Sequence, residues 1–241
     1  MNIIVVGNGG REHTIAWKIA QSPKVEKVVC VPGNGGTAKE SKCCNVEIKN
    51  CSYIKGEENP YVQIAKHEGC TMAVIGPEDP LAEGLADIFW EAGIPCVGPK
   101  KAGAQLEASK DLSKEFMAKY NVACAASKTF TDKKSAEEYV KQHGAPIVIK
   151  ADGLAAGKGV VVAATVEEAL NAVSELMDEN GRVGAAGSKL VIEDYLKGVE
   201  ISVLAAVNVD PKHPENACII PFLPSRDHKR LNDGAKGPNT G

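Results

Sequence analysis

The 241-residue sequence has few aromatic side chains and no long apolar run. Aromatic residues make up 5% of the chain, and the apolar start at residues 3–6 is far shorter than the roughly 20 residues of a membrane helix. It is also too short for the apolar core of a secretory signal, and no run of membrane length follows. We therefore expect neither a membrane span nor a leader peptide, and a cytoplasmic protein without a membrane partner.

The chain also lacks an excess of positive charge. It carries 28 Lys and Arg residues against 31 Asp and Glu residues, with a formal net charge of −3 and a pI near 6.0. No global basic field is available to hold nucleic acid, so anionic ligands would need local basic clusters. We expect small-molecule partners and no nucleic acid.

The eight cysteines include no C-x-x-C pair. Cys43, Cys44 and Cys51 lie close enough in the sequence to suggest a metal site, but no His has ligand spacing around them. A thiol inside a predicted strand behaves as a small hydrophobic group. We therefore expect reduced thiols and no zinc.

The first hundred residues alternate between short apolar segments and amphipathic ones. Strands are predicted at 2–6, 27–31 and 71–75 and near 96–97, and helices at 12–21 and 81–91. Continuous β-branched runs are typical of parallel strands that are covered on both faces. The alternation predicts an α/β domain at residues 1–100, with a doubly wound parallel sheet.

Three turns that contain glycine follow predicted strands, at 7–13, 32–37 and 76–80. Open α/β sheets bind ligands at the carboxyl ends of their strands, so these turns predict a substrate crevice. The first turn does not fit a dinucleotide, because Glu12 stands at the third glycine position and the second strand ends without an acidic residue. Arg11 beside a helix N-terminus suits a phosphate monoester, and Glu78 can accept hydrogen bonds from sugar hydroxyls or an amine. The alternative is three ordinary tight turns with solvated side chains.

Residues 146–164 in the second part of the chain contain two β-branched runs, 146–150 and 159–164, with a glycine-rich stretch between them. This pattern predicts a hairpin with Lys150 on its first strand and with Gly153, Gly157, Lys158 and Gly159 toward its tip. Glycine N–H groups and the two lysines can surround phosphate oxygens, so we interpret the hairpin as a lid over a nucleoside triphosphate. A P-loop does not fit, because three residues separate the glycines, no Ser or Thr follows the lysine, and a strand follows instead of a helix. The alternative is a flexible connection with a chance lysine.

The rest of the second part mixes helices and strands. Helices predicted at 101–107 and 109–120 would join the two domains. The elements predicted after them are a strand at 128–130, helices at 135–143 and 166–177, and strands at 189–193 and 200–207. The link at 194–198 can form a hinge in which Glu193 and Glu200 accept hydrogen bonds from an adenine amine or ribose hydroxyls. Taken singly, each Glu is more often a solvated charge at a strand end.

The final segment, residues 225–241, is polar and rich in glycine. Arg226, Lys229 and Arg230 place three cations within five residues, and Asn239 and Thr240 follow. This composition suits a second anion site. It is also typical of a solvated loop, and no helix or strand is predicted to close the chain.

Six short motifs in this order resemble one family. They are Gly7-Asn-Gly-Gly-Arg-Glu-His13, Pro32-Gly-Asn34, Gly76-Pro-Glu78, Ile149-Lys-Ala-Asp-Gly-Leu-Ala-Ala-Gly-Lys-Gly159, Asp227-His-Lys-Arg230 and Gly237-Pro-Asn-Thr-Gly241. Together they span the whole chain and are similar to the phosphoribosylamine–glycine ligases, the glycinamide ribonucleotide synthetases of purine biosynthesis.

The resemblance implies a fold and a reaction. A pre-ATP-grasp domain would precede an incomplete ATP-grasp α+β domain at 101–241, with linker helices at 101–124, a lid subdomain at about 125–196 and the start of a second subdomain at 197–241. The family members are ATP-dependent carbon–nitrogen ligases. ATP and glycine give glycyl phosphate, and the amine of 5-phosphoribosylamine attacks it to yield glycinamide ribonucleotide, ADP and phosphate. The implied cofactors are ATP and Mg²⁺ or Mn²⁺.

The resemblance also implies roles for individual residues. The residues expected to bind nucleotide are Lys110, Lys150, Gly153, Gly157 and Lys158 at the phosphates, Glu193, Tyr195 and Leu196 at adenine, and Glu200 at the ribose. The residues expected on the phosphoribosylamine side are Gly9, Gly10, Arg11, Glu78 and Lys229, and those expected to be catalytic are Asp227, Arg230 and Asn239. Positioned cations and backbone donors are what phosphoryl and acyl-phosphate transfer require.

One departure from the family is large. Its members continue past Gly241 to a Glu and an Asn that bind magnesium and to a small C-terminal domain, so this chain resembles an N-terminal fragment without metal ligands and without activity by itself. Two alternatives stay open. One is another ATP-grasp ligase of carboxylase or formyltransferase type, which would share the hairpin but not the Arg11 and Asp227 motifs. The other is a nucleotide-binding module without catalysis.

Overall fold

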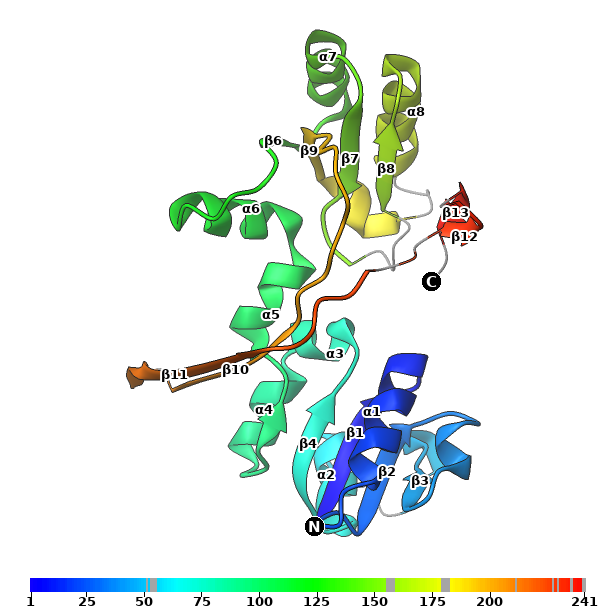
Figure 1. The fold of residues 1–241 in the computed structure, drawn as a ribbon, viewed down its shortest axis with the longest axis vertical. Helices are drawn as coiled ribbons and strands as arrows, with labels where there is room; N and C mark the ends of the chain where they lie inside the picture. The colour runs from blue at the N-terminus through cyan, green and yellow to red at the C-terminus, as the bar shows by residue number, and fades with distance from the viewer. Residues whose placement is uncertain are drawn as a thin grey trace. The chain divides into compact units, whose positions relative to one another are not determined.

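The computed structural model describes residues 1–50, 52, 56–154, 159–178, 183–210, 212–226, 228, 230–234 and 236–239. The chain divides into two compact units, residues 1–124 with 152–154 and residues 125–151 with 155–241. Figure 1 shows the elements of each unit in chain order. No helix in the described part combines the length and the apolar character that crossing a membrane requires.

The first unit is built on a five-stranded sheet in the order β3-β2-β1-β4-β5, in which each pair of neighbours is parallel. The strands are β1 (Asn2–Gly7), β2 (Lys27–Pro32), β3 (Cys43–Asn45), β4 (Cys70–Ile75) and β5 (Cys96–Val97). The predicted parallel sheet is therefore confirmed. The short edge strand β3 was not predicted, because three residues carry too little periodicity to identify a strand.

Helices cover both faces of this sheet (Figure 1). α1 (Gly10–Ala20) packs on one face, and α2 (Pro60–His67) and α4 (Leu85–Glu91) pack on the other. The unit also contains α3 (Glu78–Glu83), α5 (Lys101–Ala108), α6 (Lys110–Lys119) and the 3-10 turns η1 (Thr37–Lys39) and η2 (Ile48–Asn50). Alternate residues of β1 enter different cores: Val5 packs with Ala16 of α1, whereas Ile4 packs with Ile64 of α2 and Phe89 of α4. Burial on both faces explains the unbroken β-branched runs.

The segment predicted as one helix at 81–91 is two helices. α3 ends at Glu83 and α4 begins at Leu85, and Gly84 between them has a φ of 100°. This left-handed conformation favours glycine, which has no Cβ, and it ends the first helix. The prediction of a single helix was wrong.

The second unit is built on a four-stranded antiparallel sheet in the order β6-β9-β7-β8. Its elements are β6 (Ser127–Phe130), α7 (Lys133–His143), β7 (Ile147–Ala151), β8 (Val160–Ala163), α8 (Val166–Leu176), η3 (Gly184–Ser188) and β9 (Leu190–Asp194). Both long helices pack on one face, where Ile149 and Ile192 meet Val173 of α8. Because side chains alternate along a strand, Lys150 and Glu193 lie on the opposite face.

The predicted glycine-rich hairpin is present in the second sheet. β7 and β8 pair in antiparallel register, with Lys150 opposite Val160. The Ala151 N–H donates to the Gly159 carbonyl at 2.7 Å, which extends the pairing toward the tip. Residues 155–158 at the tip lie outside the described residues.

The C-terminal part differs from the prediction. β10 (Ala205–Asp210) pairs with β11 (His213–Pro221), and β12 (Arg230–Asn232) pairs with β13 (Lys236–Asn239), both antiparallel. The prediction of a strand at 200–207 was wrong, because β10 begins at Ala205 and the residues before it are joined at the isolated Ser202–Ser225 bridge. Alternating apolar residues favour an extended segment, but such a segment becomes a strand only where a neighbouring segment supplies main-chain hydrogen-bond partners. The β12–β13 hairpin was also not predicted.

Candidate functional site

The three glycine-containing turns lie side by side at one edge of the first sheet. They follow β2, β1 and β4, which are neighbours in that sheet. Arg11 Nη2 donates to Glu78 Oε2 at 3.2 Å and joins the first and third turns. Asn34 Nδ2 donates to the Asn8 carbonyl at 2.9 Å and joins the first and second turns. The residues expected to bind substrate in this unit therefore lie together.

Glu12 fills the space between the first and third turns, a role that sequence reasoning missed. The residue is 4% exposed; its Oε2 accepts from the Gly9 N–H and its Oε1 from Arg11 Nε, each at 2.7 Å. A Cβ placed on Gly7, Gly9 or Gly76 would lie 2.4, 2.9 or 2.1 Å from a Glu12 side-chain atom. The available signal was a Glu three residues after the helix N-cap Gly9, which is the spacing of a capping box.

Arg11 carries its charge between two carboxylates. The hydrogen bonds to Glu12 and, to a lesser degree, Glu78 raise the Arg11 pKa, although partial burial lowers it. The pKa of Glu78 is lowered, chiefly because its own main-chain N–H donates to it and further because Arg11 lies beside it. The side chains of Arg11 and Glu78 remain 57% and 43% exposed. They offer donors and acceptors together, which suits a ligand with hydroxyl or amine groups as well as a phosphate.

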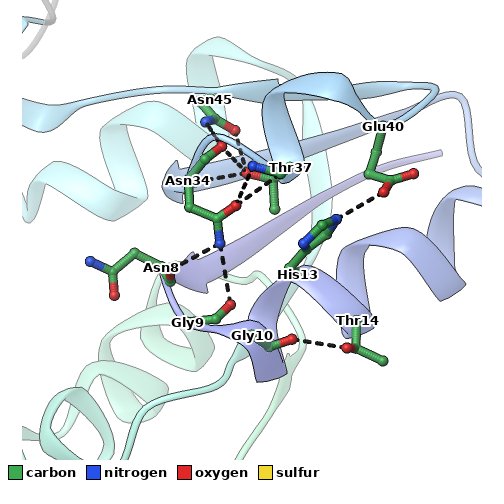
Figure 2. Close-up of polar contacts among 10 residues, drawn as sticks. Asn8, Gly9, Gly10, His13, Thr14, Asn34, Thr37, Glu40 and Asn45 are labelled. Atoms are coloured by element: carbon green, nitrogen blue, oxygen red, sulfur yellow. Dashed lines mark hydrogen bonds and ion pairs between the residues drawn. The ribbon is translucent and has the colours of Figure 1, made fainter.

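Asn34 connects the first two turns with both ends of its side chain, as Figure 2 shows. Its Oδ1 accepts from the N–H groups of Gly36 and Thr37 at 2.7 and 3.0 Å. Its Nδ2 donates to the carbonyls of Asn8 and Gly9 at 2.9 and 3.3 Å. Sequence reasoning placed Asn34 in a family motif but gave it no role.

Two further contacts brace the second turn (Figure 2). The hydroxyl of the buried Thr37 lies 2.7 Å from Asn45 Oδ1. His13 Nε2 lies 2.8 Å from Glu40 Oε1, and the His13 ring occupies the space above Gly36, where a Cβ would lie 2.3 Å from its Cε1. The turn geometry is therefore fixed by side chains from β3, α1 and the loop between β2 and β3.

Two residues expected to bind nucleotide form an ion pair in the second unit. Lys150 Nζ contacts Glu193 Oε1 on the sheet face that α7 and α8 do not cover. The register sets Val148 opposite Glu193 and Lys150 opposite Val191, so the pair runs diagonally across β7 and β9. The Lys150 and Glu193 side chains are 28% and 10% exposed. A ligand on this face would meet the Lys150 ammonium and the Glu193 carboxylate side by side.

The link after β9 begins at an anchored residue. His143 Nε2 at the end of α7 lies 2.9 Å from Asp194 Oδ1 at the end of β9. Tyr195, Leu196 and Glu200 beyond it are exposed. Of the side chains expected at adenine and ribose, these three are therefore accessible, whereas Glu193 is largely buried.

Lys110 and Gly153, both expected at the ATP phosphates, meet in the first unit. Lys110 is the first residue of α6, and its Nζ donates to the Gly153 carbonyl at 2.8 Å. Asp152, which had no predicted role, accepts from the Lys110 N–H at 2.6 Å. The structure therefore brings two of the expected phosphate ligands together beside an unexpected carboxylate.

The remaining expected residues lie in the C-terminal hairpin or outside the described part. Arg230 and Asn239 are backbone partners across β12 and β13. The residues outside the described part are Gly157, Lys158, Asp227 and Lys229. The structure thus pairs the main chains of two of the three residues expected to be catalytic.

Metal-binding side chains do not gather in the part of the chain that the structure describes. No three His, Cys, Asp or Glu residues there form a group that could hold an ion. Burial raises the pKa of Cys30 and Cys70 to about 12 and that of Cys96 to about 11. These thiols stay protonated at neutral pH, which makes them inert and poor metal ligands.

Two family models match the chain. Residues 1–107 match the phosphoribosylglycinamide synthetase N domain, and residues 108–241 match the phosphoribosylglycinamide synthetase ATP-grasp (A) domain. The phosphoribosylamine–glycine ligases of Neisseria meningitidis serogroup B and Clostridium acetobutylicum are 48% and 47% identical to the chain over 241 residues. These alignments cover 100% of the chain but 53% and 54% of the two relatives. The chain spans about half the length of the curated relatives it matches.

Solved structures share the fold. The crystal structure of phosphoribosylamine–glycine ligase from Thermotoga maritima aligns with a TM-score of 0.72 and 30% identity over 100% of this chain and 54% of that chain. The biotin carboxylase domain of the Hydrogenobacter thermophilus 2-oxoglutarate carboxylase aligns with a TM-score of 0.63 and 20% identity over 90% of this chain and 48% of that one. The second likeness concerns the fold alone. The predicted α/β architecture with a partial ATP-grasp domain is confirmed.

Proposed function

The chain belongs to the phosphoribosylglycinamide synthetase family, and from this membership we propose that it supplies the sugar-phosphate and ATP sites of a phosphoribosylamine–glycine ligase. The proposed reaction consumes ATP, glycine and 5-phosphoribosylamine. Glycine is first activated as glycyl phosphate, and the ribosylamine then attacks its carbonyl carbon. The products are glycinamide ribonucleotide, ADP and phosphate.

Within the structure, the observation that carries the proposed ATP site is the ion pair between Lys150 and Glu193. A nucleotide presents the complementary chemistry, because its phosphates are anionic and its adenine carries an amine that donates hydrogen bonds. In the proposed complex Lys150 turns to a phosphate and Glu193 accepts from the adenine amine. The Lys150 ammonium then keeps an anionic partner and the Glu193 carboxylate keeps a hydrogen-bond donor, as partly buried charged groups require. Tyr195 and Leu196 would flank the base, and Glu200 would accept from the ribose.

The turns of the first unit are proposed to bind phosphoribosylamine. Arg11 would face the phosphate, and Glu78 would accept from a ribose hydroxyl or the amine. A Cβ on Gly10 would meet nothing within 4 Å, so the main chain at the start of α1 is accessible to an anion. The Gly9 N–H already donates to Glu12, so we assign it no hydrogen bond to the substrate. Its contribution to the site is its small size.

Both chemical steps depend on alignment and charge neutralisation. We assign Lys110 and Lys158 with the glycines of the hairpin to the phosphates, and Asp227, Lys229, Arg230 and Asn239 to the reacting groups. A divalent cation, Mg²⁺ or Mn²⁺, would neutralise charge on the β- and γ-phosphates when bound. Since the described residues contain no cluster of three metal ligands, we assign no side chain of this chain to it.

Two binding activities should be separable by calorimetry. We expect one site for ATP and one for ribose 5-phosphate, a stable probe for the substrate sugar. Lys150→Ala should weaken ATP binding about tenfold, the loss of one charge-assisted hydrogen bond, and leave ribose 5-phosphate binding unchanged.

Arg11→Ala should weaken ribose 5-phosphate binding about tenfold on the same grounds and leave ATP binding unchanged.

Lys128→Ala is the matched control. Lys128 lies on β6 of the same sheet, and its ammonium lies 5.6 Å from the Phe130 ring centroid. It has no proposed ligand, so its removal should change neither affinity. A wild-type chain that binds no ATP contradicts the nucleotide site, and ribose 5-phosphate binding that survives Arg11→Ala contradicts the assignment of the first turn.

A further inference from the structure

Asp152, directly after β7, caps the N-terminus of α6. Its Oδ1 accepts from the main-chain N–H groups of Lys110 at 2.6 Å and Asp111 at 3.2 Å. Ser109 Oγ donates to its two carboxylate oxygens at 3.2 and 3.3 Å and accepts from the Leu112 N–H at 3.1 Å. The carboxylate thus serves donors that a helix leaves without intrahelical partners, at the end where negative charge is favoured.

Residues 152 and 153 accept hydrogen bonds from both the main chain and the side-chain ammonium of Lys110. Asp152 accepts from its main-chain N–H, and the carbonyl of Gly153 accepts from its Nζ at 2.8 Å. A lysine side chain on a helix surface otherwise samples many rotamers. Lys110 is partly buried and is fixed by two consecutive residues at the start of the glycine-rich stretch.

The chain changes from one compact unit to the other at this point. β7, which ends at Ala151, belongs to the second unit, whereas residues 152–154 group with the first. The hydrogen bonds from α6 to Asp152 and Gly153 bind these residues within the first unit. Gly153 has a φ of 101°, a left-handed conformation that suits a sharp change of chain direction.

We propose that Asp152 is a positioning residue for nucleotide binding: it holds Lys110 at the start of the glycine-rich stretch, where the ammonium meets the ATP phosphates. This inference rests on the proposed function, because it requires Lys110 to contact those phosphates. Asp152 itself touches no ligand in this account. A helix cap with a purely structural role would stabilise α6 without setting the affinity for ATP.

The chain offers a matched control for the loss of a cap. Asp132 is the N-cap of α7 and accepts from the Ser135 N–H at 2.9 Å. α6 has 10 residues and α7 has 11. Asp132→Ala and Asp152→Ala should therefore destabilise helices of similar length, and only Asp152→Ala should release Lys110.

The position of Lys110 can be measured without ATP. Acetylation by N-hydroxysuccinimide acetate, followed by mass spectrometry of the Lys110 peptide, reports how freely the ammonium moves. Asp152→Ala should raise the acetylation rate about threefold or more, the effect of releasing a hydrogen-bonded group. Asp132→Ala should leave the rate unchanged. Asp152→Asn keeps one oxygen acceptor for the Lys110 N–H, so its rate should lie between those of the wild type and Asp152→Ala.

ATP binding then tests the functional part with a double-mutant cycle. Asp152→Ala should weaken ATP binding about tenfold, and Asp132→Ala should change it less than about twofold. In the Lys110→Ala chain, Asp152→Ala should have little further effect, because a positioning residue acts through the residue it positions.

Three results would overturn this proposal without contradicting a nucleotide site at Lys150 and Glu193, and a fourth would contradict both. Equal acetylation rates in Asp152→Ala and the wild type overturn it, as does an ATP effect of Asp152→Ala that persists in the Lys110→Ala chain. A Lys110→Ala chain that binds ATP like the wild type also overturns it but leaves Lys150 and Glu193 as the nucleotide site. A wild-type chain without ATP affinity overturns both.

Discussion

Gly76→Ala is expected to lower the free energy of unfolding of the first unit by about 3 kcal/mol, from overpacking and disturbed charge-assisted hydrogen bonds. The new Cβ would lie 2.1 Å from Glu12 Oε1. Gly76 is not in the left-handed region, so the effect is steric and not conformational. Glu12 cannot move aside, because Gly7 and Gly9 also adjoin it and Gly9 and Arg11 hold its oxygens.

Tryptophan fluorescence during urea unfolding measures this effect selectively. The two tryptophans of the chain, Trp17 in α1 and Trp90 in α4, both belong to the first unit. Gly10→Ala is the control in the same turn, since a Cβ there meets nothing within 4 Å, and it should leave the transition nearly unchanged. If Gly76→Ala and Gly10→Ala unfold at the same urea concentration, Glu12 does not fill the space as described.

Asn34→Ala is expected to destabilise the first unit by about 2–3 kcal/mol, because it removes four hydrogen bonds of about 0.5–1.5 kcal/mol each and the turns relax in part. The N–H groups of Gly36 and Thr37 lose their acceptor, and the carbonyls of Asn8 and Gly9 lose their donor. The first and second turns then separate, so the affinity for ribose 5-phosphate should fall as well.

Asn8→Ala is the control for Asn34→Ala. Asn8 contributes its main-chain carbonyl to the network, which the substitution keeps, and Figure 2 shows its side-chain amide pointing away from Asn34. The urea midpoint by tryptophan fluorescence should shift strongly for Asn34→Ala and little for Asn8→Ala. Similar shifts for the two variants would mean that the side chain of Asn34 does not connect the turns.

The parts of the fold that the sequence predicts well are those set by local pattern. The β1, β2 and β4 strands are continuous apolar runs between glycine turns, and their parallel order follows from the helices between them. The β7–β8 hairpin likewise combines two β-branched runs with glycines. Because parallel neighbours end at the same sheet edge, the meeting of Arg11 with Glu78 also follows from topology.

The parts that the sequence did not predict depend on contacts between distant segments. Glu12 is polar and lies on a helix, so nothing local shows that three glycines from two turns enclose it. Asp152 is separated from Lys110 by more than 40 residues, and only the folded chain places it at the α6 N-terminus. The break at Gly84 was visible as a glycine inside a helical pattern, but glycine alone does not decide between a weak helix and two helices.

The central claim is that this chain provides the sugar-phosphate and ATP sites of a phosphoribosylamine–glycine ligase, and a chimera tests it most directly. The chain would replace the aligned 241 residues of the Neisseria meningitidis serogroup B ligase, to which it is 48% identical. ADP release would be measured with ATP and magnesium. The account predicts release only when glycine and phosphoribosylamine are both present, with glycinamide ribonucleotide in equal amount, and strong loss in Lys150→Ala. A folded chimera that binds ATP but releases no ADP with these substrates, or releases it with bicarbonate or formate instead, would contradict the account.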